Sequence, residues 1–319
     1  PRSVARALGL KSLDPVAAAD FILNGTVCFP YTLIEGVWVA RPGAITRVTA
    51  GKVTSIEYFQ PEEKDSLASA SDFGLELKET LREAIHYGLH DCQNIKVLFS
   101  GGEDARAVAN LLPPGRDVTL YTVADGENRE VRLARRAAKK LGYTFKFQQR
   151  PKHFYRQDIG ERIDETGGQF DIRHTHIRGE LAEPLAQADA IVGGYAADTL
   201  FKSAWMGNVE RRRFRVERLL DNPQVKPVGV QLSDQTNSLN PDLIQAVCAR
   251  RLSHHATIET VRPRSAGNWH TKWPLGTQRI AYAHLLSLRP IGPRVVEPFI
   301  DGQVYRLAAR MPEQFRVDR

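Results

Sequence analysis

The sequence contains a Ser-Gly-Gly turn directly after an apolar run, a combination that can bind an anion. Ser100-Gly101-Gly102 follows Ile95–Phe99 and precedes a segment typical of a helix. Glycines let a ligand approach the backbone without a Cβ in the way, and a helix N-terminus favours negative charge. No Gly-Lys-Ser/Thr follows, so the segment is not a Walker loop. By itself the turn indicates either a phosphate site or an ordinary structural turn.

Short apolar runs alternate with helix-like segments around this turn. We expect strands at Ile95–Phe99, Val118–Val123, Thr144–Gln148 and Ala190–Val192, with helices through about Leu112 and over Arg129–Leu141. Gly142 is the expected stop of the second helix. The alternation predicts an α/β fold with a doubly wound parallel sheet covered on both faces. Ligands of such sheets collect at the carboxyl ends of the strands, where the Ser-Gly-Gly turn would lie.

The flanking regions have a different pattern. We expect a helix over Asp14–Leu23 with Asp14 as its N-cap, because Pro15 suits the first helical position. Runs rich in β-branched and aromatic residues predict short strands at Val37–Ala40, Ala44–Val48 and Val53–Phe59. The polar stretch Pro61–Ser71 reads as a linker. A helix from Gly74 follows, with the apolar stripe Leu77, Leu81, Ile85 and Leu89, and the chain beyond Ala204 reads as mostly helical with loops.

Several segments, in order, resemble one known family. Val97 to Arg106 (VLFSGGEDAR) is similar to the SGGxDS loop of the N-type ATP pyrophosphatases, in the adenine nucleotide alpha hydrolase-like superfamily, and within it to the asparagine synthetase branch. Ile191 to Phe201 (IVGGYAADTLF) resembles the second glycine loop, GxGxDExF. Glu297–Asp301 (EPFID) resembles the PFLD segment. The front of the chain resembles the bridge between glutaminase and synthetase domains, so we expect a bridge segment at residues 1–65 and a synthetase domain at residues 66–319.

The resemblance implies an ATP-dependent carbon–nitrogen ligase that forms AMP. Adenylation of a carboxylate releases pyrophosphate and makes AMP a leaving group for amide formation. The resemblance places Mg²⁺ on Asp104 and Asp198, one from each glycine loop, and Mg²⁺ takes few protein ligands beside phosphate oxygens and water. The rest of the expected nucleotide site, with pyrophosphate at the glycine loops and adenine at the two strand ends, is Ser100, Gly101, Gly102, the backbone of Ala105, Gly193, Gly194, Leu98 and Val123. Each aspartate also suits a helix N-cap.

Three residues depart from the asparagine synthetase pattern. Ala105 stands where the family usually has Ser, and Thr199 where those enzymes have Glu. Tyr195 stands where β-lactam and carbapenam synthetases carry a tyrosine of an acid–base pair. It is the candidate catalytic residue, acting on a substrate amine if a partner lowered its pKa. We find no glutamate at the matching distance, so a packing role for Tyr195 stays open.

The resemblance leaves several functions open. Transfer of ammonia or an amine to a small-molecule or peptide carboxylate is the default. Intramolecular ring closure, as in β-lactam synthetases or lasso-peptide cyclases, is the alternative that Tyr195 favours. An RNA-modifying enzyme of the same fold is a second class, and a non-catalytic nucleotide-binding protein is a third, suggested by Ala105 and Thr199.

Partners and compartment follow from composition and from the same resemblance. The net charge is +7 and the densest basic run is Arg211–Arg215, read as a solvated helix face or a polyanion contact. Without an aromatic-interleaved recognition motif we do not expect nucleic acid. The three cysteines lack metal spacing and predict free thiols in a reducing compartment. No membrane span or signal peptide is expected, so we predict a cytoplasmic protein, with a homodimer left open.

Two further expectations concern the catalytic apparatus. The nucleophilic cysteine of a glutaminase domain is absent, so nitrogen would come from a glutaminase or an ammonia source outside this chain. The late lysine of the family would lie beyond Arg319. His174 and His176 lack a third ligand at zinc-like spacing and read as pocket wall or surface loop.

Overall fold

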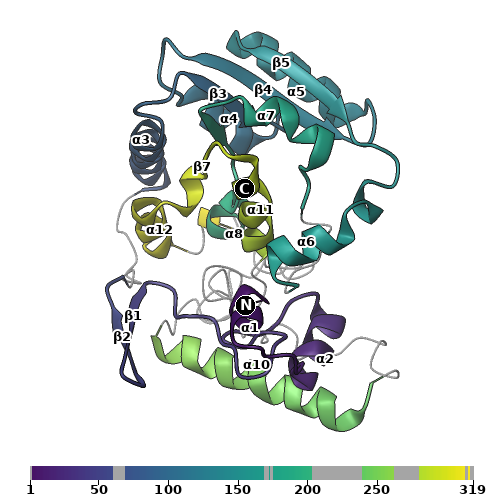
Figure 1. Ribbon diagram of the computed structural model, residues 1–319. Coiled ribbons are helices and arrows are strands. Elements are labelled where there is room, and N and C mark those ends of the chain that lie inside the picture. The colour runs from purple at the N-terminus through teal and green to yellow at the C-terminus, as the bar shows by residue number, and fades with distance from the viewer. Residues whose placement is uncertain are drawn as a thin grey trace.

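A five-stranded parallel sheet is the main sheet of the molecule and lies in the upper part of Figure 1. The computed structural model describes residues 2–59, 69–168, 172, 175–202, 239–261, 280–312 and 315–316. The strands are β3 (Asn94–Leu98), β4 (Asp117–Ala124), β5 (Thr144–Gln149), β6 (Ala190–Val192) and β7 (Arg294–Val296), in the spatial order β5-β4-β3-β6-β7. All four pairings are parallel.

Both faces of this sheet are covered. Side chains of successive strand residues point to opposite faces. Leu120 and Val192 belong to one buried cluster, whereas Tyr121 and Ile191 belong to another on the opposite face. The α/β, doubly wound prediction is therefore confirmed.

Helices supply the two buried layers. The first cluster includes residues from α3 (Ala70–Gly88), α4 (Glu103–Asn110), α5 (Arg129–Leu141), α8 (Ala197–Phe201) and α12 (Gly302–Ala309). The second includes residues from α7 (Glu183–Ala186) and α11 (Ile280–Leu288). The expected stripe on α3 is confirmed, with Leu81, Ile85 and Leu89 buried, although the helix begins at Ala70, four residues earlier than expected, with Ser69 as its cap. Gly142 ends α5 in the left-handed conformation, as expected.

The amino-terminal region forms its own small elements. These are α1 (Arg2–Ala7), α2 (Pro15–Asn24) and an antiparallel hairpin of β1 (Ala44–Thr49) and β2 (Lys52–Glu57). Asp14 caps α2 as expected, since its carboxylate accepts from the N–H groups of Val16 and Ala17.

Two strand assignments need correction. The expected strand Val37–Ala40 does not form. Within it only Trp38 makes a β-bridge, to Tyr31, and among the described residues no strand pairs with the rest of the segment. Conversely, β7 lies in a region expected to be helical. It has three residues, too few for a periodic signal, and its pairing with β6 depends on tertiary structure. The expected linker 61–71 lies largely outside the described residues, as do Arg211–Arg215 and His174.

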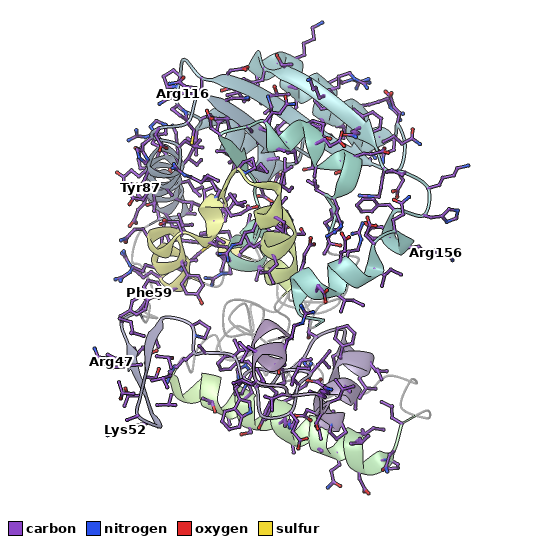
Figure 2. All side chains as sticks on the ribbon, viewed as in Figure 1. Arg47, Lys52, Phe59, Tyr87, Arg116 and Arg156 are labelled. Carbon is purple, nitrogen blue, oxygen red and sulfur yellow. The ribbon has the colours of Figure 1, made fainter. Side chains whose placement is uncertain are left out.

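The remaining long helix, α10 (Pro241–Val261), packs against α2 rather than against the sheet. In Figure 1 it lies with the amino-terminal helices on the side of the molecule away from the sheet. Phe59, at the end of the hairpin, reaches α12, where its ring lies 6.1 Å from Tyr305 and under the guanidinium of Arg306 (Figure 2). The predicted range 66–319 thus contributes a helix to the amino-terminal unit, and the boundary at residue 65 stays a prediction.

None of the three cysteines forms a disulfide bond, and Cys28 and Cys92 are buried. Among the described helices none is both long and apolar enough to cross a bilayer.

Candidate nucleotide site

The first glycine loop connects β3 to α4 and is packed tightly against α5. Gly101 has φ +75°, and a Cβ added there would lie 2.7 Å from the Cα of Ala134. Both the conformation and the contact exclude a side chain. Gly102 N–H donates to the hydroxyl of Ser100 at 3.2 Å, and Gly102 is the N-cap of α4 without a side-chain cap. The loop therefore holds its backbone at a helix N-terminus, the arrangement that suits an anion.

The second glycine loop connects β6 to α8 and approaches two other segments closely. Gly193 N–H donates to the carbonyl of Val296 at 3.0 Å. A Cβ added at Gly193 would lie 2.1 Å from Oε1 of Glu297, so the glycine makes room for this carboxylate. A Cβ added at Gly194 would lie 3.8 Å from Asp104 and Ala105, in ordinary contact. The two glycine loops therefore lie directly against each other.

Asp104 and Asp198 meet at one ammonium group. Nζ of Lys202 lies 2.7 Å from Oδ2 of Asp104 and 2.8 Å from Oδ1 of Asp198. Burial lowers the pKa of Lys202, but its hydrogen bonds to the two aspartates outweigh this and hold the pKa above its ordinary value. The lysine therefore stays charged at neutral pH. The two carboxylates come from different loops, so their convergence depends on the order of β3 and β6 in the sheet.

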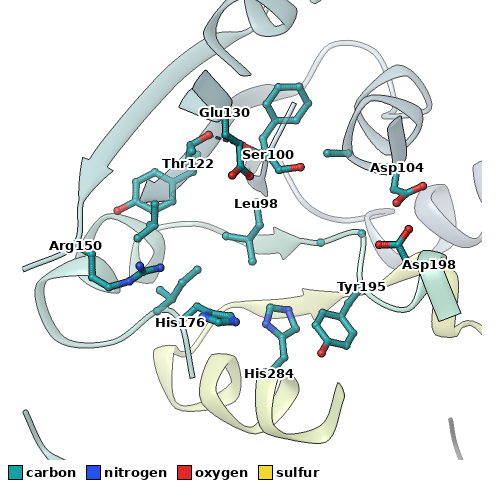
Figure 3. A pocket seen from close by; sticks show the side chains of 17 residues that line it. Leu98, Ser100, Asp104, Thr122, Glu130, Arg150, His176, Tyr195, Asp198 and His284 are labelled. Carbon is teal, nitrogen blue, oxygen red and sulfur yellow. Dashed lines mark hydrogen bonds between the residues drawn. The ribbon is translucent and has the colours of Figure 1, made fainter. Parts of the chain in front are cut away.

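A pocket of about 370 Å³ opens at this edge of the sheet (Figure 3). Nine of the predicted site residues line it: Leu98, Ser100, Asp104, Ala105, Val123, Gly193, Gly194, Tyr195 and Asp198. Gly101 and Gly102 shape the loop without lining the pocket. His176, expected as pocket wall or surface, lines it and lies 3.2 Å from the hydroxyl of Tyr155 through Nδ1.

Tyr195 is held in one wall of the pocket by a histidine and a glutamate. The ring of His284 stacks on it at 4.7 Å, and Oε2 of Glu297 accepts from its backbone N–H at 2.9 Å. Burial, with a smaller contribution from the Glu297 charge, raises the pKa of Tyr195 to about 12. The structure thus supplies a glutamate close to Tyr195, but one that raises rather than lowers the pKa of the phenol.

Glu297 also fixes the orientation of His284. The Glu297 side chain is 1% exposed, and its Oε1 lies 2.8 Å from Nε2 of His284. A buried carboxylate that accepts from one ring nitrogen sets the tautomer of the imidazole and leaves the other nitrogen as an acceptor. His284 also lines the pocket, so its imidazole is available to a bound ligand. Neither residue could be assigned this role from the sequence. His284 lies on α11 and Glu297 follows β7, and their pairing leaves no local sequence pattern.

Arg150 lies at the opposite end of the pocket from the aspartates (Figure 3). It follows β5, pairs with Asp125, and its guanidinium lies 5.6 Å and 5.4 Å from the ring centroids of Phe154 and Tyr155. Its Nε atom is buried and has no hydrogen-bond partner among the residues that the structure describes. The pocket therefore has a cation at one end and a carboxylate pair with its lysine at the other.

The two aspartates fit a divalent cation only in part. Among the described residues, no group of three or more His, Cys, Asp or Glu side chains could hold a metal ion. Yet Asp104 and Asp198 already share a cation, the Lys202 ammonium, and their oxygens are the ligand type that Mg²⁺ prefers. Phosphate oxygens and water would have to supply the other ligands.

One protein family matches the central part of the chain. Residues 93–196, which include both glycine loops through Ala196, match a family of unknown function (DUF7411). No curated protein matches the chain.

Several solved structures match over parts of the chain. A predicted subunit of tRNA methyltransferase from Methanocaldococcus jannaschii is 21% identical with a TM-score of 0.25, over 40% of this chain and 64% of that one. An NH₃-dependent NAD synthetase from Campylobacter jejuni subsp. jejuni is 13% identical with a TM-score of 0.30, over 58% and 95%. An NMN synthetase from Francisella tularensis is 10% identical with a TM-score of 0.29, over 79% and 97%. At these TM-scores the fold assignment rests on the strand order itself.

Proposed function

We propose that this chain is an ATP-dependent, AMP-forming ligase of the asparagine synthetase-like kind, which adenylates a carboxylate and couples it to ammonia or an amine. The observation that carries the proposal is the convergence of two glycine loops, distant in sequence, on one pocket, with Asp104 and Asp198 brought together at one end of it by Lys202. The pocket lies at the carboxyl ends of the parallel strands, where ligands of such sheets bind.

The residues around the pocket suit the two steps of this chemistry. In the first, a carboxylate oxygen attacks the α-phosphorus of ATP and pyrophosphate leaves. The backbone N–H groups of the first loop would donate to the phosphates, and the ammonium of Lys202, once released from the two aspartates, would add positive charge there. Mg²⁺ on the two aspartates would neutralise the developing charge.

In the second step, the amine attacks the acyl carbonyl, loses a proton and displaces AMP. We propose His284, oriented by Glu297, as the acceptor of this proton, whereas Tyr195, with a pKa of about 12, would remain a phenol. Leu98 and Val123 line the pocket at the strand ends, where the adenine ring would lie.

Ring closure within one substrate remains the alternative, because Tyr195 lines the pocket. The alternative differs in needing no external amine. Product analysis with and without ammonium separates the two: amide formation that depends on ammonium supports intermolecular transfer, and loss of water from a single substrate supports cyclisation.

The proposal is tested by ATP–pyrophosphate exchange across a panel of carboxylates, with Asp104→Asn beside the wild type. We expect exchange with at least one carboxylate and a loss of roughly 100-fold or more in the variant, because the charged cation ligand is removed. Asp117→Asn is the matched control, since Asp117 is exposed at the amino end of β4, the other edge of the same sheet. Exchange that persists in Asp104→Asn would remove Asp104 from the metal site, and no exchange with any carboxylate would argue against adenylation.

A further inference from the structure

Lys202 occupies the position that a cation shared by Asp104 and Asp198 would need. Its Nζ lies 2.7 Å and 2.8 Å from one oxygen of each aspartate and 3.9 Å from Oε2 of Glu103. The Lys202 side chain is 23% exposed, so its charge is partly shielded from water. The lysine follows α8 directly, four residues after Asp198, and this spacing brings its side chain back to that aspartate.

An ammonium group and a divalent ion cannot both sit between these carboxylates. Mg²⁺ binds oxygen at about 2.1 Å, closer than the 2.7 Å and 2.8 Å contacts of Lys202. A metal bound to both aspartates would therefore place its charge against the ammonium, at a separation where like charges repel strongly. One cation must leave before the other binds.

We propose that Lys202 is an internal cation that holds the two glycine loops together in the nucleotide-free protein and is displaced by a divalent ion, after which its ammonium turns to the phosphates of the nucleotide. The identity of that nucleotide rests on the proposed function; the competition between the two cations does not. A lysine suits this exchange because its charge is compact and sits on a flexible four-carbon stem.

Displacement of the Lys202 ammonium by a divalent ion couples metal binding to nucleotide binding. A divalent ion that binds without a nucleotide displaces the ammonium of Lys202 from both aspartates, and no phosphate is present to replace them. A triphosphate supplies that partner, so each ligand strengthens the binding of the other, and the coupling is reciprocal. Metal without nucleotide should accordingly bind weakly.

The first test measures Mn²⁺ binding without nucleotide by electron paramagnetic resonance. Lys202→Met should bind Mn²⁺ at least about tenfold more tightly than the wild type, because the competing charge is gone. Lys202→Arg, which keeps the charge, should bind as weakly as the wild type. Lys78→Met removes the same charge from an exposed position on α3 and corrects for net charge. Equal affinity in Lys202→Met and the wild type would overturn the proposal.

A second test needs no variant and therefore holds even if Lys202→Met does not fold. The acetylation rate of Lys202 by acetic anhydride is followed by mass spectrometry, with Lys78 as the internal reference. Saturating Mn²⁺ should raise the rate at Lys202 several-fold, and α,β-methylene-ATP should lower it again as the phosphates cover the amine. A rate at Lys202 that does not change with Mn²⁺ would show that the ammonium stays in place.

These outcomes separate the inference from the proposed function. If the Mn²⁺ and acetylation results are as expected but no ATP–pyrophosphate exchange is found, the competition between the two cations is supported and the ligase function is not. If the protein exchanges pyrophosphate but Mn²⁺ does not change the acetylation rate of Lys202, the ligase function is supported and the competition between the two cations is not.

Discussion

Tyr195 shows how the surroundings of a residue decide the chemistry that it can do. Its resemblance to the tyrosine of β-lactam and carbapenam synthetases suggests an acid–base role, which requires a pKa near the working pH. In the folded protein its ring is stacked on His284 and its backbone is held by Glu297. Burial and the nearby carboxylate raise the pKa to about 12, so the phenol is expected to stay protonated at neutral pH.

This environment makes a pH-dependent prediction for Tyr195→Phe. Because the pKa is raised, the ionised form appears only as pH approaches 12. The rate profile between about pH 6 and pH 9 should keep its shape in the variant, with a rate loss of less than about tenfold. Tyr143→Phe, which removes another tyrosine hydroxyl with a burial-raised pKa, is the control. An alkaline limb that disappears in Tyr195→Phe would show that the phenol does titrate in this range.

At the scale of elements, two glycines fix how closely the loops approach their neighbours. Gly101 lies against α5 and Gly193 against the carboxylate of Glu297. Neither approach could be predicted from the loop sequence, because each depends on a residue distant along the chain. Position 101 requires glycine partly because its backbone has a positive φ. Position 193 requires glycine only because a side chain there would collide with Glu297.

Gly193→Ala and Gly194→Ala form a matched pair at adjacent positions. A Cβ at Gly193 would lie 2.1 Å from Oε1 of Glu297, so this carboxylate must move away from His284 and from the N–H of Tyr195. We expect a loss of about 2–4 kcal/mol in unfolding free energy, since a buried charge loses hydrogen bonds. At Gly194 the nearest atoms lie 3.8 Å away, and we expect less than about 1 kcal/mol. Urea unfolding measures both, and equal losses would contradict the assigned contact.

At the scale of the whole molecule, a buried ion pair joins α10 to the amino-terminal region. Nε of Arg251 lies 2.6 Å from Oδ1 of Asp20, with side-chain exposures of 0% and 3%. Arg251 also donates to the carbonyl of Thr26, and Asp20 accepts from the N–H of Cys28. Segments more than two hundred residues apart are thus joined by charge-assisted hydrogen bonds in the interior.

Neighbouring arginines on α10 test this connection. Arg251→Met leaves Asp20 buried without its cation and should cost about 3–5 kcal/mol of unfolding free energy. Arg250→Met removes a more exposed pair with Asp14, 24% exposed on the arginine side, together with a contact to the Tyr31 ring, and should cost about 1–2 kcal/mol. Urea unfolding followed by circular dichroism compares the two. A smaller loss in Arg251→Met than in Arg250→Met would mean that the buried pair does not hold the two regions together.

The sequence alone determined the elements whose signals are local. Asp14 capping α2, the stripe on α3 and the strand–glycine–helix order of the sheet are all patterns within a few residues. The resemblance to the asparagine synthetase branch named nine of the residues that line the pocket, and their place agrees with the rule that strand ends share one edge of a parallel sheet.

Only the tertiary structure decided what lies between those residues. β7 forms a strand because β6 lies beside it and pairs with it. Val37–Ala40 does not form a strand, because no described strand pairs with it beyond the single bridge at Trp38. His284 and Arg150 line the pocket, and Lys202 and Glu297 contact other residues that line it. These contacts join different elements and leave no periodic pattern in the sequence. The charge that sits between the two aspartates is therefore fixed by packing, which local residue preferences do not encode.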